Sequence, residues 1–278
     1  MDLHTIERYR YARTRDDLRL APGESVVAGG TWFFSEPQVD TSGIVDLTSM
    51  NWPALEDLPD GGLRIGATCP IADIVALESR PGWRAQPLFT ECANALLASF
   101  KIWNVATVGG NICRSFAAAS MVSLAAGLDG IAEIWCPDGT DRRIPVAEMI
   151  TGNGTNRLAD GEVLRAVEIP GSSMRADTAF RKIALAELGR SGAVLTGRRD
   201  ADGSVVVGIT AATTRPCLLR FPGTPTADDL RDRVNSVDDY YSDPLGSADW
   251  RRGVSAVLAE QIRVQLADPA PSAQGASR

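Results

Sequence analysis

The sequence predicts an α+β fold whose last third contains a small antiparallel sheet packed against helices. Polar and apolar residues alternate over 180–185, 193–197 and 204–210, as they do in half-buried strands. Asp202-Gly203, just before the last of these runs, is a favoured hairpin-turn sequence. Apolar residues then recur at helical spacing over 250–262, so we expect an amphipathic helix that packs on this sheet.

The first third of the chain contains short elements separated by turns. It begins with the aromatic and basic stretch Tyr9-Arg10-Tyr11, which should lead into a short polar helix or turn. Its other expected elements are strands at 25–28 and 44–47 and a helix or extended segment at 31–34. Residues 51–62 are rich in turn-forming residues and mark a subdomain boundary.

The middle of the chain mixes strands with apolar helices. Its predicted strands are 63–67, 131–135 and 163–169, and Asp138-Gly139 marks a hairpin turn. Its predicted helices are 70–78, 88–98 and 117–128. The last of these has small and apolar residues throughout, so it should be buried on all sides.

Two Gly-Gly pairs organise the whole sequence. Residues 26–33 are VVAGGTWF and residues 106–112 are ATVGGNI, so each pair follows an apolar run and precedes a small polar residue. Glycine permits a positive φ and a close approach of the backbone to a ligand. Successive N–H groups in such a turn can bind an anion. Two such turns predict a ligand with two negative groups, such as a dinucleotide pyrophosphate, although each pair alone is compatible with an ordinary hairpin turn.

Other phosphate-binding motifs are absent from the sequence. No Gly-Lys-Ser/Thr follows either glycine pair at the spacing of a P-loop, and neither pair belongs to a GxGxxG that opens a helix. A P-loop NTPase and a nicotinamide-binding Rossmann domain are therefore disfavoured.

Composition excludes several further classes of function. The net charge of −7 argues against a nucleic-acid partner. No membrane-spanning run and no secretory signal are evident, so we expect a cytoplasmic protein. The five cysteines lack metal-binding spacing and should be reduced thiols. His4 is the only histidine, which removes Ser-His-Asp and Cys-His catalysis. We therefore predict no catalytic and no metal-binding residue in this chain.

The glycine pairs and four further segments resemble the FAD-binding medium subunit of molybdenum hydroxylases, the family of xanthine dehydrogenase and carbon monoxide dehydrogenase. That family has an AGGT-type first loop and a Thr-Val/Ile-Gly-Gly-Asn second loop at about this spacing. The further segments are IGATCPIADI at 65–74, the helix leading into the second loop, GEVLRAVEIP at 161–170 and FRKIA at 180–184. The resemblance covers roughly residues 20 to 265.

The resemblance implies a two-subdomain PCMH-type FAD-binding fold followed by a C-terminal α+β domain with a small antiparallel sheet and helices. The implied divisions are FAD-binding subdomain 1 at 1–56, subdomain 2 at 57–170, the C-terminal domain at 171–267 and a disordered tail at 268–278. The tail is rich in proline, serine and alanine, which favours disorder.

The resemblance also implies a set of FAD-binding residues. They are Val26, Val27, Ala28, Gly29, Gly30, Thr31, Trp32, Phe33, Leu97, Thr107, Val108, Gly109, Gly110, Asn111, Ser120, Leu164 and Lys182. The threonines and the asparagine can donate hydrogen bonds to phosphate oxygens or, alternatively, only cap turns. Lys182 is implied near the flavin ring, where a cation stabilises the reduced form, and its alternative is a solvated lysine on a strand. Leu164 and Leu97 would contact the flavin, and a core position explains Leu97 equally well.

Two positions depart from the family. An acidic residue that contacts the nucleotide half of FAD is replaced by Ser120, and an arginine common before the second loop is replaced by Trp103. Serine forms one hydrogen bond where a carboxylate accepts two. The adenosine end of FAD should therefore be held differently or less tightly.

The resemblance implies an electron-transfer subunit of a hetero-oligomer. FAD on this chain would take electrons from [2Fe-2S] clusters of a small iron–sulfur subunit and pass them to an external acceptor, while a large subunit carries a molybdenum cofactor and oxidises the substrate. Two alternatives remain: a structural or assembly subunit that has lost its flavin, and a standalone flavin oxidase.

Overall fold

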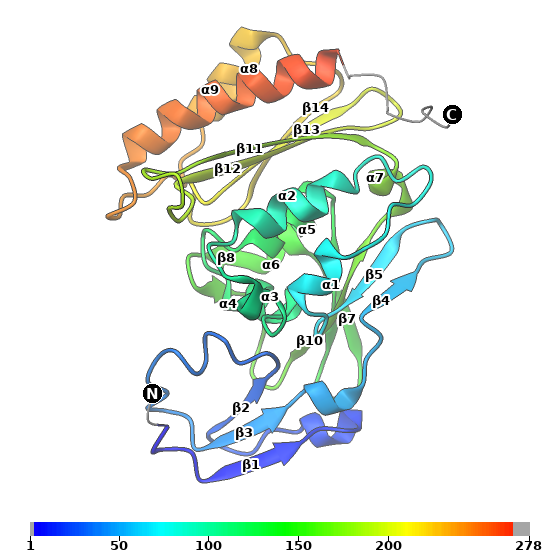
Figure 1. Ribbon diagram of the computed structural model, residues 1–278, viewed down its shortest axis with the longest axis vertical. Coiled ribbons are helices and arrows are strands. Elements are labelled where there is room, and N and C mark those ends of the chain that lie inside the picture. Colours follow the sequence, from blue (N-terminus) through cyan, green and yellow to red (C-terminus); the bar gives the residue numbers. More distant parts are fainter. Residues whose placement is uncertain (1–2, 269–278) are drawn as a thin grey trace.

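The computed structural model describes residues 3–268, and the predicted disorder of the tail falls on residues outside this range except Asp268. Within the described range the strands form three main sheets and one short ribbon. The sheets follow one another along the long axis of the molecule, with a group of helices between the second and third (Figure 1).

The first sheet is parallel and lies at the N-terminal end of the molecule (Figure 1, blue). Its central strand β3 (Gly43–Asp46) pairs with β1 (Arg8–Tyr11) and β2 (Glu24–Val27). Two 3-10 turns, η1 (Arg15–Leu18) and η2 (Thr48–Met50), follow β1 and β3. The aromatic and basic stretch is thus a strand that the sequence did not predict, because an edge strand leaves its side chains half exposed and breaks the expected apolar alternation.

Residues 31–34 form a turn, so the predicted helix or extended segment there is wrong. The Phe34 N–H donates to the Gly30 carbonyl at 2.8 Å, and Gly30 has a positive φ. That left-handed residue turns the chain away from both regular geometries.

The second sheet is antiparallel, with strand order β4-β5-β10-β6-β7. Its strands are β4 (Leu55–Asp57), β5 (Leu63–Gly66), β10 (Val163–Ile169), β6 (Ile131–Trp135) and β7 (Asp141–Pro145). Its helices are α1 (Ile71–Val75), α2 (Pro87–Ala95), α3 (Phe100–Trp103), α4 (Val108–Arg114), α5 (Ser120–Gly127) and α6 (Val146–Met149). The ribbon β8 (Ile150–Gly152) and β9 (Thr155–Asn156) follows α6.

The helix group is centred on α5, which is buried along its whole length as predicted for 117–128. The helix begins later than predicted, at Ser120. The predicted helix 88–98 is shorter in the structure: α2 ends at Ala95, and α3 begins only at Phe100. The segment between these two helices borders the cleft described below.

The third sheet is antiparallel, in the order β11-β12-β13-β14, and confirms the predicted C-terminal sheet. Its strands are β11 (Asp177–Ile183), β12 (Ala193–Arg199), β13 (Val205–Thr210) and β14 (Cys217–Phe221), preceded by the short helix α7 (Gly171–Met174). Helices α8 (Ala227–Asn235) and α9 (Ala248–Ala267) cover its outer face (Figure 1). Helices α2 and α5 contact its inner face, so β12 and β13 are buried on both sides.

Candidate functional site

The first glycine pair lies in a tight turn directly after β2. Gly30 has a φ of 65°, and a Cβ at Gly29 would lie only 1.8 Å from the Val105 carbonyl oxygen. One glycine therefore provides the left-handed conformation, and the other allows the turn to touch the segment before α4. Among residues 3–268, no acceptor pairs with the backbone N–H groups of residues 29–33. Five successive available donors match the anion-binding turn predicted here.

The second glycine pair lies in the first turn of α4, and neither glycine has a positive φ. The N–H groups of residues 108–111 are all used within the protein, by the carbonyls of Ala67, Cys69 and Thr107 and by the Thr107 side chain. A Cβ at Gly109 would lie 2.6 Å from the Ala67 carbonyl oxygen. The prediction of a second turn with free donors is therefore wrong, because these glycines allow α4 to pack closely instead.

A cleft of about 490 Å³ opens between the first glycine turn and the segments around α3 and α4. Twelve of the predicted residues line it: Val26, Val27, Ala28, Gly29, Gly30, Thr31, Trp32, Phe33, Leu97, Thr107, Gly110 and Asn111. The two segments can lie this close because residue 29 is a glycine: a Cβ there would be 1.8 Å from the Val105 carbonyl oxygen. The structure thus brings the two glycine pairs to one cleft.

Five predicted residues do not line this cleft. Val108 and Gly109 are buried beneath it in α4. Ser120 and Leu164 are buried in α5 and β10, and the Ser120 hydroxyl has no hydrogen-bond partner within the described residues. Lys182 is half-buried on β11, on the face of the third sheet that it shares with Phe180. Their contact with a ligand stays a prediction.

Thr107 and Asn111 have the capping roles that were the alternative to ligand binding. The Thr107 hydroxyl accepts from the Gly110 N–H at 3.1 Å and caps α4. The Asn111 side-chain oxygen accepts from the Met121 N–H at 2.9 Å, in the first turn of α5. Neither side chain donates a hydrogen bond to any of residues 3–268. Each therefore keeps one donor group at the cleft.

The sequence did not point to Arg114, the last residue of α4. Its guanidinium carbon lies 3.6 Å from the ring centroid of Trp32 and 4.5 Å from that of Phe116. Phe116, Ile102 and Arg190 line the cleft as well and were also not predicted. A signal for Arg114 did exist, because it is the only charged residue between Lys101 and Asp129.

The cleft is electropositive in a chain of net charge −7. Among the residues that the structure describes, Arg114 and Arg190 are its charged lining residues, and no aspartate or glutamate lines it. Burial lowers the pKa of Arg114 from its ordinary value, with Glu36 opposing the shift. Burial also raises the pKa of the Cys113 thiol, which lines the same cleft, to about 12, so this thiol adds no negative charge near neutral pH. The lining therefore favours an anionic ligand.

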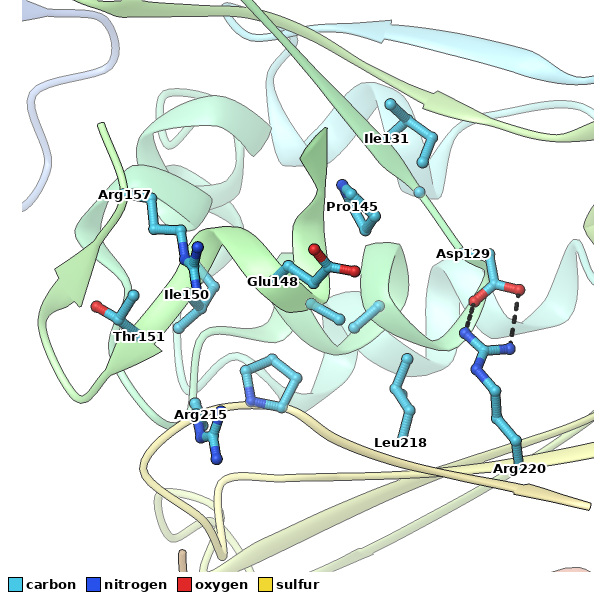
Figure 2. Close-up of a pocket in the computed structure, with 14 residues that line it drawn as sticks. Asp129, Ile131, Pro145, Glu148, Ile150, Thr151, Arg157, Arg215, Leu218 and Arg220 are labelled. Atoms are coloured by element: carbon cyan, nitrogen blue, oxygen red, sulfur yellow. Dashed lines mark hydrogen bonds and ion pairs between the residues drawn. The ribbon is translucent and has the colours of Figure 1, made fainter. Parts of the chain in front are cut away.

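A second hollow, of about 750 Å³, lies between α6 and β14 (Figure 2). It differs from the cleft because it contains carboxylates and because, within residues 3–268, three of its five charged lining residues are paired. Asp129 binds Arg220 at 2.6 Å and Arg198 at 2.5 Å, and Arg215 binds Asp239 at 2.9 Å. The electropositive cleft is therefore the stronger candidate for a cofactor site.

Comparison with known proteins shows which family the chain belongs to. The family described as the FAD binding domain in molybdopterin dehydrogenase matches residues 11–172. The chain belongs to this family. The matched region contains both glycine pairs, Arg114 and every lining residue of the cleft except Arg190.

Sequence relatives and solved structures agree with this family assignment. The xanthine dehydrogenase FAD-binding subunit of Escherichia coli O157:H7 is 33% identical over 111 residues, which are 40% of this chain and 37% of that relative's length. The solved structure of quinoline 2-oxidoreductase from Pseudomonas putida 86 matches with a TM-score of 0.76 and 18% identity, over 93% of this chain and 96% of that one. A Cu,Mo-containing CO dehydrogenase matches with a TM-score of 0.80 and 18% identity, over 94% and 99%. At such identities the structural matches establish the fold, which is the predicted FAD-binding fold with its C-terminal sheet.

The residues present fit FAD. The glycine turn and Arg114 provide donors and positive charge for a pyrophosphate. Leu96, Leu97 and Ile102 provide an apolar wall in the same cleft, as a flavin or adenine ring requires. No helix among residues 3–268 is long and apolar enough to cross a membrane.

Proposed function

We propose that this chain holds FAD in the cleft and is the electron-transfer subunit of a multi-subunit molybdenum-containing dehydrogenase. The observation that carries the proposal is a run of five residues that line an electropositive cleft and whose N–H groups have no acceptor among residues 3–268. Such a cleft binds the two negative charges of a pyrophosphate. Membership of the FAD-binding family supports the identity of the ligand.

The chain's own residues bind and orient the cofactor. The N–H groups of residues 29–33 would hold the pyrophosphate, and the free donors of Thr107 and Asn111, which line the same cleft, would add hydrogen bonds. The apolar wall excludes water from one edge of the rings. When bound, FAD accepts and releases electrons. Nothing in the lining of the cleft activates water or a C–H bond, so we assign no substrate chemistry to this chain.

We propose that the electrons come from [2Fe-2S] clusters on a small iron–sulfur subunit and leave to an external acceptor, while a large subunit with a molybdenum cofactor oxidises the substrate. Support comes from the matched relatives, which include a xanthine dehydrogenase FAD-binding subunit and a Cu,Mo-containing CO dehydrogenase. Short-range electron transfer needs a partner that docks beside the cleft.

An exposed apolar surface next to the cleft offers such a docking site. It consists of Leu97, Phe100, Leu185 and Leu188, which are 59%, 70%, 62% and 83% exposed. Leu97 lines the cleft itself, and Arg190, two residues after Leu188, lines it too. The four side chains come from the two segments that contribute Leu97 and Arg190 to the cleft, and large exposed apolar side chains are typical of a protein interface. We call this set the apolar rim.

The test is the flavin content of the purified chain. We expect the visible absorption of bound flavin at close to one FAD per chain, together with assembly into a complex with iron–sulfur and molybdenum subunits. A colourless chain that still assembles would instead support the flavin-free assembly subunit, which Ser120 and the occupied N–H groups of the second glycine pair favour. Oxidation of a substrate by the chain alone would support the standalone oxidase.

A further inference from the structure

Arg114 makes no direct hydrogen bond or ion pair with the described residues, and Glu36 acts on its charge only from a longer distance. Its guanidinium stacks on Trp32 at 3.6 Å and on Phe116 at 4.5 Å, and the two rings meet edge to face at 6.2 Å. Its Nε atom is buried without an acceptor among residues 3–268. Stacking on aromatic faces offsets part of the cost of burying a guanidinium, but it satisfies none of the five N–H groups.

Two other buried arginines are paired: Arg198 binds Asp129 and Asp200, and Arg251 binds Asp243 and three backbone carbonyls. Within the described residues Arg165 is unpaired like Arg114 and stacks on Trp52 and Trp135, but it does not line the cleft. A desolvated cation is normally paired, because leaving its donors unsatisfied costs free energy. The donors of Arg114 thus lack the acceptors that the protein supplies to Arg198 and Arg251.

The position of Arg114 indicates which group provides hydrogen-bond acceptors for its guanidinium. Trp32, on which it stacks, belongs to the glycine turn whose N–H groups 29–33 are available. Arg114 and residues 29–33 all line the cleft, and the stacking on Trp32 places the guanidinium beside the glycine turn. A ligand group that satisfies both must carry several anionic oxygens close together, as a diphosphate does.

We propose that Arg114 is a further ligand-binding residue, whose guanidinium pairs with the diphosphate of FAD while Trp32 and Phe116 hold it in place. This inference rests on the proposed function. This contact makes the cleft selective, because riboflavin lacks the group that Arg114 recognises.

The test compares three ligands on four proteins: the wild type, Arg114→Met, Arg114→Lys and Arg233→Met. Binding of FAD, ADP and riboflavin to the full chain is measured by titration calorimetry. We expect Arg114→Met to weaken FAD and ADP by roughly 10- to 100-fold, the range of a charge-assisted pair, and riboflavin by less than about 2-fold. Arg114→Lys should restore part of the loss. Arg233, which stacks on Phe221 far from the cleft, is the matched control and should leave all three affinities unchanged.

Different outcomes separate the two proposals. If the wild type binds FAD and Arg114→Met binds it equally well, the role of Arg114 is wrong and the FAD site stands. An equal loss for riboflavin and FAD would place the guanidinium against the flavin ring, which also overturns the diphosphate contact. If the wild type binds none of the three ligands, the proposed function itself fails. Should Arg114→Met not fold, the same comparison of ADP with riboflavin on Arg114→Lys decides the question.

Discussion

Gly30 is the residue whose conformation the first glycine turn depends on most directly. We predict that Gly30→Ala lowers FAD affinity by at least about tenfold, because a side chain at φ 65° is strained by about 1 kcal/mol or more and its Cβ would lie 2.4 Å from the Phe34 ring. Gly139→Ala is the matched control: it has a φ of 89° in a hairpin turn, with no atom within 4 Å of the added Cβ. Both variants are titrated with FAD. Equal affinities in the two would show that the turn adjusts to a side chain.

Lys182 gives a second prediction at the scale of a residue. If it lies near the flavin, Lys182→Met removes a cation that favours the negative charge gained on reduction, so the two-electron potential of the bound flavin should fall by about 20–40 mV. Arg181→Met is the control, because Arg181 points to the opposite face of β11 and binds Gln261. Redox titration of both variants checks this. A potential unchanged in Lys182→Met would place Lys182 away from the ring.

At this scale the sequence predicted the motif residues better than the residues around them. Gly29 and Gly30 were predictable because a positive φ and a close backbone approach both require glycine, so the residue type itself indicates the turn. Arg114, Phe116 and Trp32 meet only after α4 has packed beside the first turn, and nothing in their sequence spacing indicates that contact. The stacking of an arginine depends on which aromatic rings lie near it in the folded chain, and a single sequence does not show these contacts.

Among the elements, α4 shows why the two similar glycine motifs have different roles. Both were predicted as open turns from the same local pattern. In α4, however, Thr107 acts as the N-cap and the neighbouring segment at Ala67 and Cys69 accepts the next N–H groups. The N–H groups of residues 108–111 are therefore bonded within the protein. The sequence motif alone does not show this, because the acceptors include distant residues. Strands such as β13 were predictable because burial on at least one face fixes their pattern.

The carboxylate of Asp129, in the turn after α5, links this part of the chain to the third sheet by hydrogen bonds. Asp129 accepts hydrogen bonds from Arg198 on β12 and Arg220 on β14. Burial raises the pKa of Asp129, but the hydrogen bonds from the two arginines outweigh it and hold the pKa below its ordinary value. We predict that Asp129→Asn lowers the free energy of unfolding by roughly 2 kcal/mol at pH 7. Asparagine tolerates the φ of 54° at this position, so the change reports on charge.

The effect of Asp129→Asn should depend on pH with a definite sign. A depressed pKa contributes stability above the unfolded-state value, about 3.9, and this contribution disappears as the pH falls through the folded-state value. The difference between wild type and variant should therefore be constant from about pH 5 to 8 and shrink below about pH 4. Asp228→Asn, whose side chain is exposed and pairs only with Arg231, is the control. Urea unfolding across this range measures both, and a difference that grows towards low pH contradicts the assignment.

At the scale of the whole molecule, the apolar rim includes Leu97, which lines the cleft. Helix α9 instead covers the outer face of the third sheet (Figure 1). We predict that Leu188→Glu removes the partner subunits during co-purification and leaves FAD bound, because a charge in an apolar interface is desolvated without a partner. Val257→Glu alters an apolar position on α9 that is 60% exposed, and it should not affect assembly. Mass spectrometry of the purified complexes gives the subunit content. Loss of the partners in both variants would exclude the rim as the specific interface.

The lining of the cleft also predicts which steps this chain can carry out without its partner subunits. It contains donors, two arginines and apolar side chains, and none of these can serve as a general base or activate water. We therefore expect the isolated chain with FAD to reduce no dye in the presence of organic substrates, and the complex with its iron–sulfur and molybdenum subunits to do so. The same chain should still accept electrons when a reduced [2Fe-2S] protein is added, because that step requires only the cofactor and a docking surface. Dye reduction measured with and without the co-expressed partners tests this, and substrate-dependent reduction by the chain alone would return the standalone oxidase to first place.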